Sequence, residues 1–158
     1  MIVKTPTELA EALKPGQRLF GLDLGEKTIG LALCDVRLTV ATPFETIAKR
    51  KFILDAETLI ALIAKHDVGG LVIGLPLNMN GTEGPAAQSA RAFARNFDAK
   101  HKMPILFWDE RLSTAAVTRT LIEADVSRAK RKEVVDKMAA AFILQGALDF
   151  ISRAKRNA

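Results

Sequence analysis

The sequence predicts an α/β fold with a mixed sheet of five strands, flanked by helices, and three observations lead to this prediction. Residues 18–47 contain a tight hairpin followed by a third strand-like segment. Residues 70–74 and 104–108 are short apolar runs that alternate with segments of helical periodicity. The first three strands are therefore expected to be antiparallel, and the last two to join the sheet as parallel strands.

The first 17 residues predict a helical extension ahead of this sheet. Thr5 offers an N-cap, Pro6 fits the first helical position and Glu8 completes a capping box. The helix should run to Lys14 and end at Pro15-Gly16. Residues 18–158 are expected to form a single domain, since a chain of 158 residues is large enough for one core.

The remaining elements follow in order. Residues 18–24 and 28–34 are predicted to form the hairpin, because the three residues between them are too few for any other connection. Residues 40–47 give the third strand. Further along, we expect helices over 52–65, 86–100, 113–124 and 131–154, strands over 70–74 and 104–108, and a turn-rich loop over 75–85.

Charge is divided unevenly along the chain. Residues 1–110 carry 13 basic and 13 acidic side chains, whereas residues 111–158 carry 10 and 5, which accounts for the net charge of +5. The run SRAKRK is the densest basic stretch and suits phosphate contact, although a solvated helix start would look the same. Its candidate nucleic-acid contacts are Arg128, Lys130, Arg131 and Lys132.

Several classes of protein are disfavoured. No apolar run approaches the roughly 20 residues that span a bilayer, and the opening residues do not resemble a signal peptide, so we expect a cytoplasmic protein without a membrane partner. The single Cys34 excludes a disulfide within the chain and a multi-cysteine zinc site. It is expected to be a packed, inert thiol.

Acidic residues stand at positions where an apolar residue or a turn former is usual. Asp23 lies between two leucines near the end of the first hairpin strand, and Asp109 and Glu110 directly follow the strand over 104–108. Asp136 heads a stripe of the last helix that continues through Ala140, Ile143, Ala147 and Phe150. Because reactive groups gather at the carboxyl ends of neighbouring strands, these acids are expected to converge.

Converging carboxylates would repel one another unless a cation compensated them. Oxygen ligands without histidine or cysteine at metal-like spacing favour Mg²⁺ or Mn²⁺. His66 and His101 are expected at helix ends, away from the acids. Alternative interpretations remain: turn amides could satisfy Asp23, Asp136 could be an acid of a helix N-terminal turn, and Asp109-Glu110 could be a capping pair.

Four segments then resemble a known family: GLDLGEKTIGLALCD (21–35), VIGLPLNMNGTEGP (72–85), DERLST (109–114) and VDKMAAAFILQ (135–145). In this order they are similar to the YqgF family, also called RuvX, of pre-ribosomal-RNA nucleases and Holliday junction resolvase-like proteins. The resemblance covers Arg18 to about Ile151. It implies a ribonuclease H-like fold acting with divalent metal, with an acidic triad at Asp23, Glu110 and Asp136.

The implied chemistry is hydrolysis of phosphodiester bonds by two metal ions. Asp23 would bridge the ions, Glu110 and Asp136 would each complete one site, and Asp109 is a further ligand or an acceptor that orients Arg111. The 75–85 loop either brings amides close to a phosphate or is an ordinary turn. The candidate substrate contacts in this region are Lys27, Asn78, Asn80, Arg111 and Ser113.

The sequence leaves several functions open. The first is a nuclease that matures the 5′ end of pre-16S rRNA, with structured RNA as its partner. A Holliday junction-resolving DNA endonuclease is the second, for which a homodimer rather than a monomer is expected because two strands are cut. A non-catalytic RNA-binding assembly factor is the third. The segment DLGEKTIG also resembles the phosphate-binding hairpin of the actin and Hsp70 superfamily, but 158 residues supply one such domain where those proteins use two.

Overall fold

The structure is a computed structural model that describes residues 1–112 and 128–157, with side chains of the second range described from Val135 onward. The predicted helix over 113–124 lies outside the described residues. The elements in chain order are β1 (Ile2–Val3), α1 (Pro6–Ala12), β2 (Arg18–Leu24), β3 (Thr28–Cys34), β4 (Ala41–Ala48), α2 (Phe52–Lys65), β5 (Val68–Leu75), α3 (Pro85–Lys100), β6 (Ile105–Asp109), the short 3₁₀ helix η1 (Glu110–Leu112) and α5 (Arg128–Arg156).

The sheet has the mixed topology that the sequence predicts. Its strand order is β1-β6-β5-β2-β3-β4. β2 and β3 are antiparallel, as are β3 and β4, whereas β5 runs parallel to both β2 and β6. All five predicted strands form. A sixth strand, β1, adds two residues in parallel beside β6, so the N-terminal segment joins the sheet edge before α1 begins.

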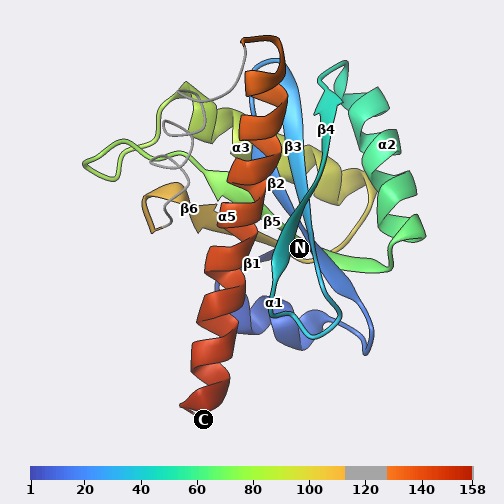
Figure 1. Ribbon diagram of the computed structural model, residues 1–158, viewed down its shortest axis with the longest axis vertical. Coiled ribbons are helices and arrows are strands. Elements are labelled where there is room, and N and C mark those ends of the chain that lie inside the picture. Colours follow the sequence, from blue (N-terminus) through green and yellow to red (C-terminus); the bar gives the residue numbers. More distant parts are fainter. Residues whose placement is uncertain (113–127, 158) are drawn as a thin grey trace.

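Helices cover both faces of the sheet. In Figure 1, α5 crosses one face, with its C-terminal end beside α1, whereas α2 and α3 lie behind the other face. Each face has its own buried cluster of apolar side chains. The cluster under α2 and α3 includes Phe20, Leu59 and Phe97, and the cluster under α5 includes Leu19, Ile143 and Leu144.

The α5 face carries small residues where α5 crosses β2 and β3. Because side chains alternate along a strand, Gly21 and Asp23 of β2 face α5, whereas Phe20 and Leu22 face α2 and α3. A Cβ on Gly21 would lie 2.7 Å from the carbonyl oxygen of Ala140 in α5. The backbone of α5 therefore rests directly on the strands.

α5 follows its predicted docking stripe only in part. Ala140, Ile143 and Ala147 are fully buried, but Phe150 is 42% exposed and Ile151 is buried instead. The prediction for Phe150 was wrong because steps of three and four residues drift from the helical repeat of 3.6 residues, so that the buried side moves to the neighbouring position. Among the described residues, no helix is long and apolar enough to cross a membrane.

Candidate functional site

Asp23 lies between two glycines at the carboxyl end of β2. Across the antiparallel pair it stands opposite Gly30 of β3. On its other side the register pairs Leu22 with Ile73, which brings Gly74 of β5 alongside Asp23. Only 8% of Asp23 is exposed. The carboxylate is therefore flanked on the α5 face by two positions without side chains.

Asp136 of α5 packs over the first of these glycines. A Cβ on Gly30 would overlap the main-chain carbonyl of Asp136, so the helix touches the strand at this turn. The hydroxyl of Thr28 donates a hydrogen bond to Asp136 Oδ2, and Asp136 is only 7% exposed. Since directly opposed residues of antiparallel strands lie about 5 Å apart, Asp136 and Asp23 come from adjoining backbone positions.

Glu110 packs over the second glycine. It begins η1 directly after β6, and its carboxyl carbon lies 3.3 Å from where a Cβ on Gly74 would be. Ile143 of α5 contacts the same position at 2.5 Å. All three acids of the predicted triad thus lie at one end of the sheet, on the face covered by α5.

The side chains of the three acids do not form a complete metal-binding site. Among the side chains described in residues 1–112 and 135–157, no group of three histidine, cysteine, aspartate or glutamate residues is placed to hold a metal ion. The donor chemistry fits a hard divalent cation, because all three groups supply carboxylate oxygens. Their backbone positions come together, whereas their side chains as described do not yet make a common ligand set.

Asp109 pairs with Arg111 at the edge of the site. Its carboxylate accepts hydrogen bonds from Arg111 Nη2 at 2.8 Å and from the Arg111 amide at 3.0 Å. The hydrogen bonds from the Arg111 side chain are the main cause that holds the pKa of Asp109 below its ordinary value, against the opposing effect of burial. Asp109 therefore contacts Arg111 directly, and its two predicted roles, further metal ligand or acceptor that orients Arg111, stay predictions.

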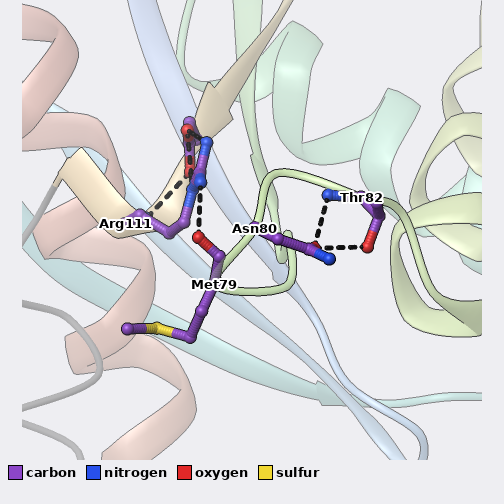
Figure 2. Close-up of polar contacts among 5 residues, drawn as sticks. Met79, Asn80, Thr82 and Arg111 are labelled. Carbon is purple, nitrogen blue, oxygen red and sulfur yellow. Dashed lines mark hydrogen bonds and ion pairs between the residues drawn. The ribbon is translucent and has the colours of Figure 1, made fainter.

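The same guanidinium reaches the 75–85 loop. Arg111 Nη1 donates to the carbonyl oxygen of Met79 at 3.3 Å, a contact between positions 32 residues apart that Figure 2 shows. The loop is closed by its own side chains: Asn78 Nδ2 donates to the Thr82 hydroxyl at 2.9 Å, and that hydroxyl donates to Asn80 Oδ1 at 2.6 Å. Asn78 and Asn80 are exposed, and both hold the turn.

The predicted basic contacts are placed only in part. Lys27 is exposed in the turn between β2 and β3. Ser113 lies outside the described residues. Four basic residues lie on the first turns of α5, ahead of Asp136, in the part of the helix whose side chains lie outside the description; these are Arg128, Lys130, Arg131 and Lys132.

The two histidines and the cysteine, which were not expected to take part in catalysis, lie at helix ends and in the core. His66 and His101 are the C-cap residues of α2 and α3, as predicted. Cys34 is buried, and burial raises the pKa of its thiol. Sequence reasoning missed Thr28 and Gly30 as parts of the site, and it assigned Gly74 to the phosphate-binding loop motif rather than to a position beside the acids. A glycine inside a strand indicates close approach of another backbone, which is the signal that could have identified the two glycines.

A comparison with protein families decides the classification of this arrangement. The family model described as "RuvX: Holliday junction resolvase" matches residues 17–150. The chain belongs to the RuvX family. This confirms the resemblance found in the four sequence segments.

Similar curated proteins carry one shared name, "Putative pre-16S rRNA nuclease". The protein of this name from Paramagnetospirillum magneticum is 62% identical over 149 residues, covering 94% of this chain and 96% of its own length. The one from Zymomonas mobilis subsp. mobilis is 60% identical over 151 residues, covering 94% and 92%. These RuvX relatives match along almost the entire chain.

Solved structures show the same fold at low identity. T. thermophilus RuvC in complex with a Holliday junction substrate superposes with a TM-score of 0.54 at 10% identity, covering 86% of this chain and 96% of that one. The yeast mitochondrial Holliday junction resolvase Ydc2 gives 0.53 at 13% identity, covering 94% and 84%. The predicted ribonuclease H-like fold class is confirmed.

Proposed function

We propose that this RuvX protein is a divalent-metal-dependent nuclease that hydrolyses phosphodiester bonds in the 5′-end maturation of pre-16S rRNA. One observation carries the proposal: Asp23 lies between Gly30 and Gly74, with Asp136 packed over the first glycine and Glu110 over the second. Asp23 and Asp136 are buried, and the carboxyl ends of neighbouring strands are where α/β sheets place their functional groups. The shared name of the curated relatives supports the choice of substrate.

The acids would act as ligands. Asp23, at the centre, would bridge two ion positions, with Glu110 completing one and Asp136 the other, and Asp109 available as a further ligand. Mg²⁺ or Mn²⁺ bound there would supply activation of water and stabilisation of charge on the leaving oxygen. Thr28 would hold the Asp136 carboxylate toward the β2–β3 turn through its hydrogen bond. Side-chain rotation is needed to complete the ligand set.

The cationic residues would admit an anionic polymer to this acidic site. Arg111 is fixed by Asp109 and by the carbonyl of Met79, so its guanidinium is held at the rim with little rotational freedom to lose. The basic run at the start of α5 and Lys27 would contact the phosphate backbone. With precursor rRNA as substrate, we place the activity in the cytoplasm.

The test is cleavage of an RNA that spans the 5′ end of 16S rRNA and its precursor extension. Wild-type protein should cut it with Mg²⁺ or Mn²⁺ and should fail in EDTA, whereas Asp23→Asn should fail with either ion. Cleavage that continues in EDTA, or in Asp23→Asn, would rule out the proposed mechanism. Binding of the RNA without cleavage by the wild type would instead support a non-catalytic assembly factor.

A second candidate is a junction-resolving DNA endonuclease, favoured by the description of the matching family model. This activity needs two active sites, one for each strand, so a homodimer is expected, whereas the RNA nuclease could act as a monomer. Four-way junction DNA and matched precursor RNA should be compared at equal protein concentration. Faster cleavage of the junction, together with dimer formation, would favour the second candidate.

A further inference from the structure

A second basic run lies near the acids, and the fold brings it there from another part of the sheet. Lys49, Arg50 and Lys51 connect the end of β4 to the start of α2. The Lys49 amide donates to the carbonyl of Lys27 at 2.8 Å, and Lys49 Nζ lies 3.3 Å from the carbonyl oxygen of Gly25. Lys49 therefore lies against the β2–β3 turn, two residues beyond Asp23, and Lys27 belongs to the same turn.

A groove opens next to this basic run. Its volume is about 180 Å³, several times the roughly 30 Å³ share of a water molecule. Leu24 and Phe93 give it an apolar floor, Gly25 forms one wall, and Lys49 and Ser89 stand on its rim together with the acidic Glu26. We name this feature the flank groove.

The aromatic floor is held in place by neighbouring rings. Phe93 makes an edge contact with Phe52 of α2, with ring centroids 5.5 Å apart and planes at 77°. It also stacks on Phe97, at 6.0 Å and 13°. An apolar floor containing a fixed aromatic ring, with an ammonium group on the rim, suits one nucleotide, whose base can contact the ring while its phosphate meets the cation.

The flank groove and the candidate site are two sides of one strand end. Asp23 and Leu24 are consecutive residues of β2, so their side chains point to opposite faces of the sheet. Gly25 lies between the groove and the candidate site. It lines the groove, and a Cβ on it would lie 3.9 Å from Asp136 Oδ2. A polymer lying across Gly25 would reach both places and would pass the Lys49 ammonium group, which lies 3.3 Å from the Gly25 carbonyl oxygen.

We propose that the flank groove binds one nucleotide of a single-stranded flank of the nucleic acid that is cut at the candidate site, with Lys27, Lys49 and Lys51 contacting its phosphates. This inference rests on the proposed nuclease function. It extends that function by giving the substrate a single-stranded segment and a path, from the acids over Gly25 toward the start of α3. This surface has a net positive charge, because its basic residues outnumber the acidic Glu26 and Asp55; they are Lys27, Lys49, Arg50 and Lys51.

The first test compares Lys49→Gln with Lys65→Gln in the full chain. Lys65 is equally exposed but ends α2, and that helix of 14 residues is about 21 Å long, so Lys65 serves as a matched control. Binding to precursor RNA with a single-stranded flank is measured by fluorescence anisotropy over a range of salt concentrations. The slope of log K against log salt is negative, and Lys49→Gln should reduce its magnitude by about 0.7, the value for one phosphate contact of a single strand. Lys49→Arg should restore the slope, and Lys65→Gln should leave it unchanged.

The second test identifies the occupant. Ser89→Phe adds a ring on the exposed rim and should weaken binding of flanked RNA, but not of an RNA trimmed to its duplex. Equal slopes for Lys49→Gln and Lys65→Gln, or the same effect of Lys49→Gln on the trimmed duplex, would overturn the flank groove while cleavage by the wild type continued. Failure of the nuclease proposal would look different: cleavage would be absent from the wild type, whereas the binding comparison would still give its answer.

Discussion

The two faces of the sheet are built from different residues and do different work. On the α2 and α3 face, β2 and β3 present Phe20, Leu22, Ile29 and Leu31, all of them fully buried. On the α5 face the same strands present glycines and Asp23 near their shared end. Large side chains give one face its apolar burial, and bare positions on the other allow the α5 backbone to deliver Asp136 beside Asp23.

The buried acids follow the same division. Asp55 is 2% exposed and belongs to α2, where both of its oxygens accept the Arg50 amide, at 3.1 and 3.2 Å. It therefore completes the N-terminal turn of a helix and needs no further role. Asp136 is also buried, but its side chain meets Thr28 of another element, at the end of the sheet where Asp23 and Glu110 lie.

Replacing an acid of the α5 face should give the largest effect. We expect Asp136→Asn to lower the single-turnover rate of RNA cleavage by about 10³-fold, or about 4 kcal/mol in the barrier. The melting temperature should stay unchanged or rise, because one of several neighbouring negative charges is removed. Wild-type rates in this variant, measured on protein shown to be folded by circular dichroism, would contradict the division between the faces.

Truncating a side chain of the opposite face should change stability and leave chemistry intact. Leu59→Ala in α2 removes a fully buried side chain and should lower the free energy of unfolding by about 3 kcal/mol. Urea denaturation measures this loss. The cleavage rate of the folded fraction should match the wild type at a temperature well below the transition, and a large drop there would show that this face also shapes the site.

Adding one methyl group to the α5 face should lower both the stability and the rate of cleavage. Gly30→Ala places a Cβ against the carbonyl of Asp136, where only backbone movement relieves the overlap, so we expect a loss of about 2 kcal/mol together with slower cleavage. In Gly84→Ala the nearest neighbours, atoms of Asn78, lie at 3.9 and 4.0 Å, so only the smaller loss from replacing the N-cap residue of α3 is expected. Equal urea midpoints for the two variants would show that α5 does not rest on Gly30.

The smallest effect is expected at the other end of the sheet, where Asp35 follows β3. Burial alone would raise the pKa of Asp35, but hydrogen bonds from the hydroxyl and amide of Thr39 and the amide of Val40 outweigh it and lower the pKa to about 2. An unfolded aspartate titrates near pH 3.9. The stabilisation, about 1 kcal/mol for such a partly exposed group, is therefore complete above about pH 4 and is lost as the pH falls toward 2.

Asp35→Asn checks this sign. The variant should be less stable than the wild type at pH 7, and the difference should shrink between about pH 4 and pH 2 as the wild-type carboxyl takes up its proton. Urea midpoints across this range give the comparison. Cleavage at neutral pH should be nearly unchanged, because Asp35 lies at the opposite end of the sheet from the candidate acids. A strong loss of activity would contradict this expectation.

Much of the fold was predictable because local signals and global packing agree. The three residues between β2 and β3 require a hairpin, and the helical periodicity of residues 52–65 gave the bounds of α2 as observed. β1 could not be predicted, because a strand of two residues has no periodicity and forms only through its partner β6. Phe150 was mispredicted because a stripe counted in steps of three and four residues drifts away from the buried side of a long helix.

The convergence of the three candidate acids was predictable, whereas the contacts that support them were not. Asp23, Glu110 and Asp136 were unusual residues at positions where the topology brings strand ends together. The contact from Arg111 to the Met79 carbonyl, and the placement of Lys49 beside Gly25, join residues that are distant in the chain. No local pattern specifies such pairs, because tertiary packing alone decides them.

Asp23, Glu110 and Asp136 are proposed to bind a divalent cation together on the α5 face. Isothermal calorimetry of Mn²⁺ binding tests this proposal. The proteins compared are the wild type, Asp23→Asn, Glu110→Gln, Asp136→Asn and the buried control Asp55→Asn. We expect binding by the wild type and by Asp55→Asn, and at least about tenfold weaker binding by each of the other three variants. Unchanged affinity in those three variants would contradict it.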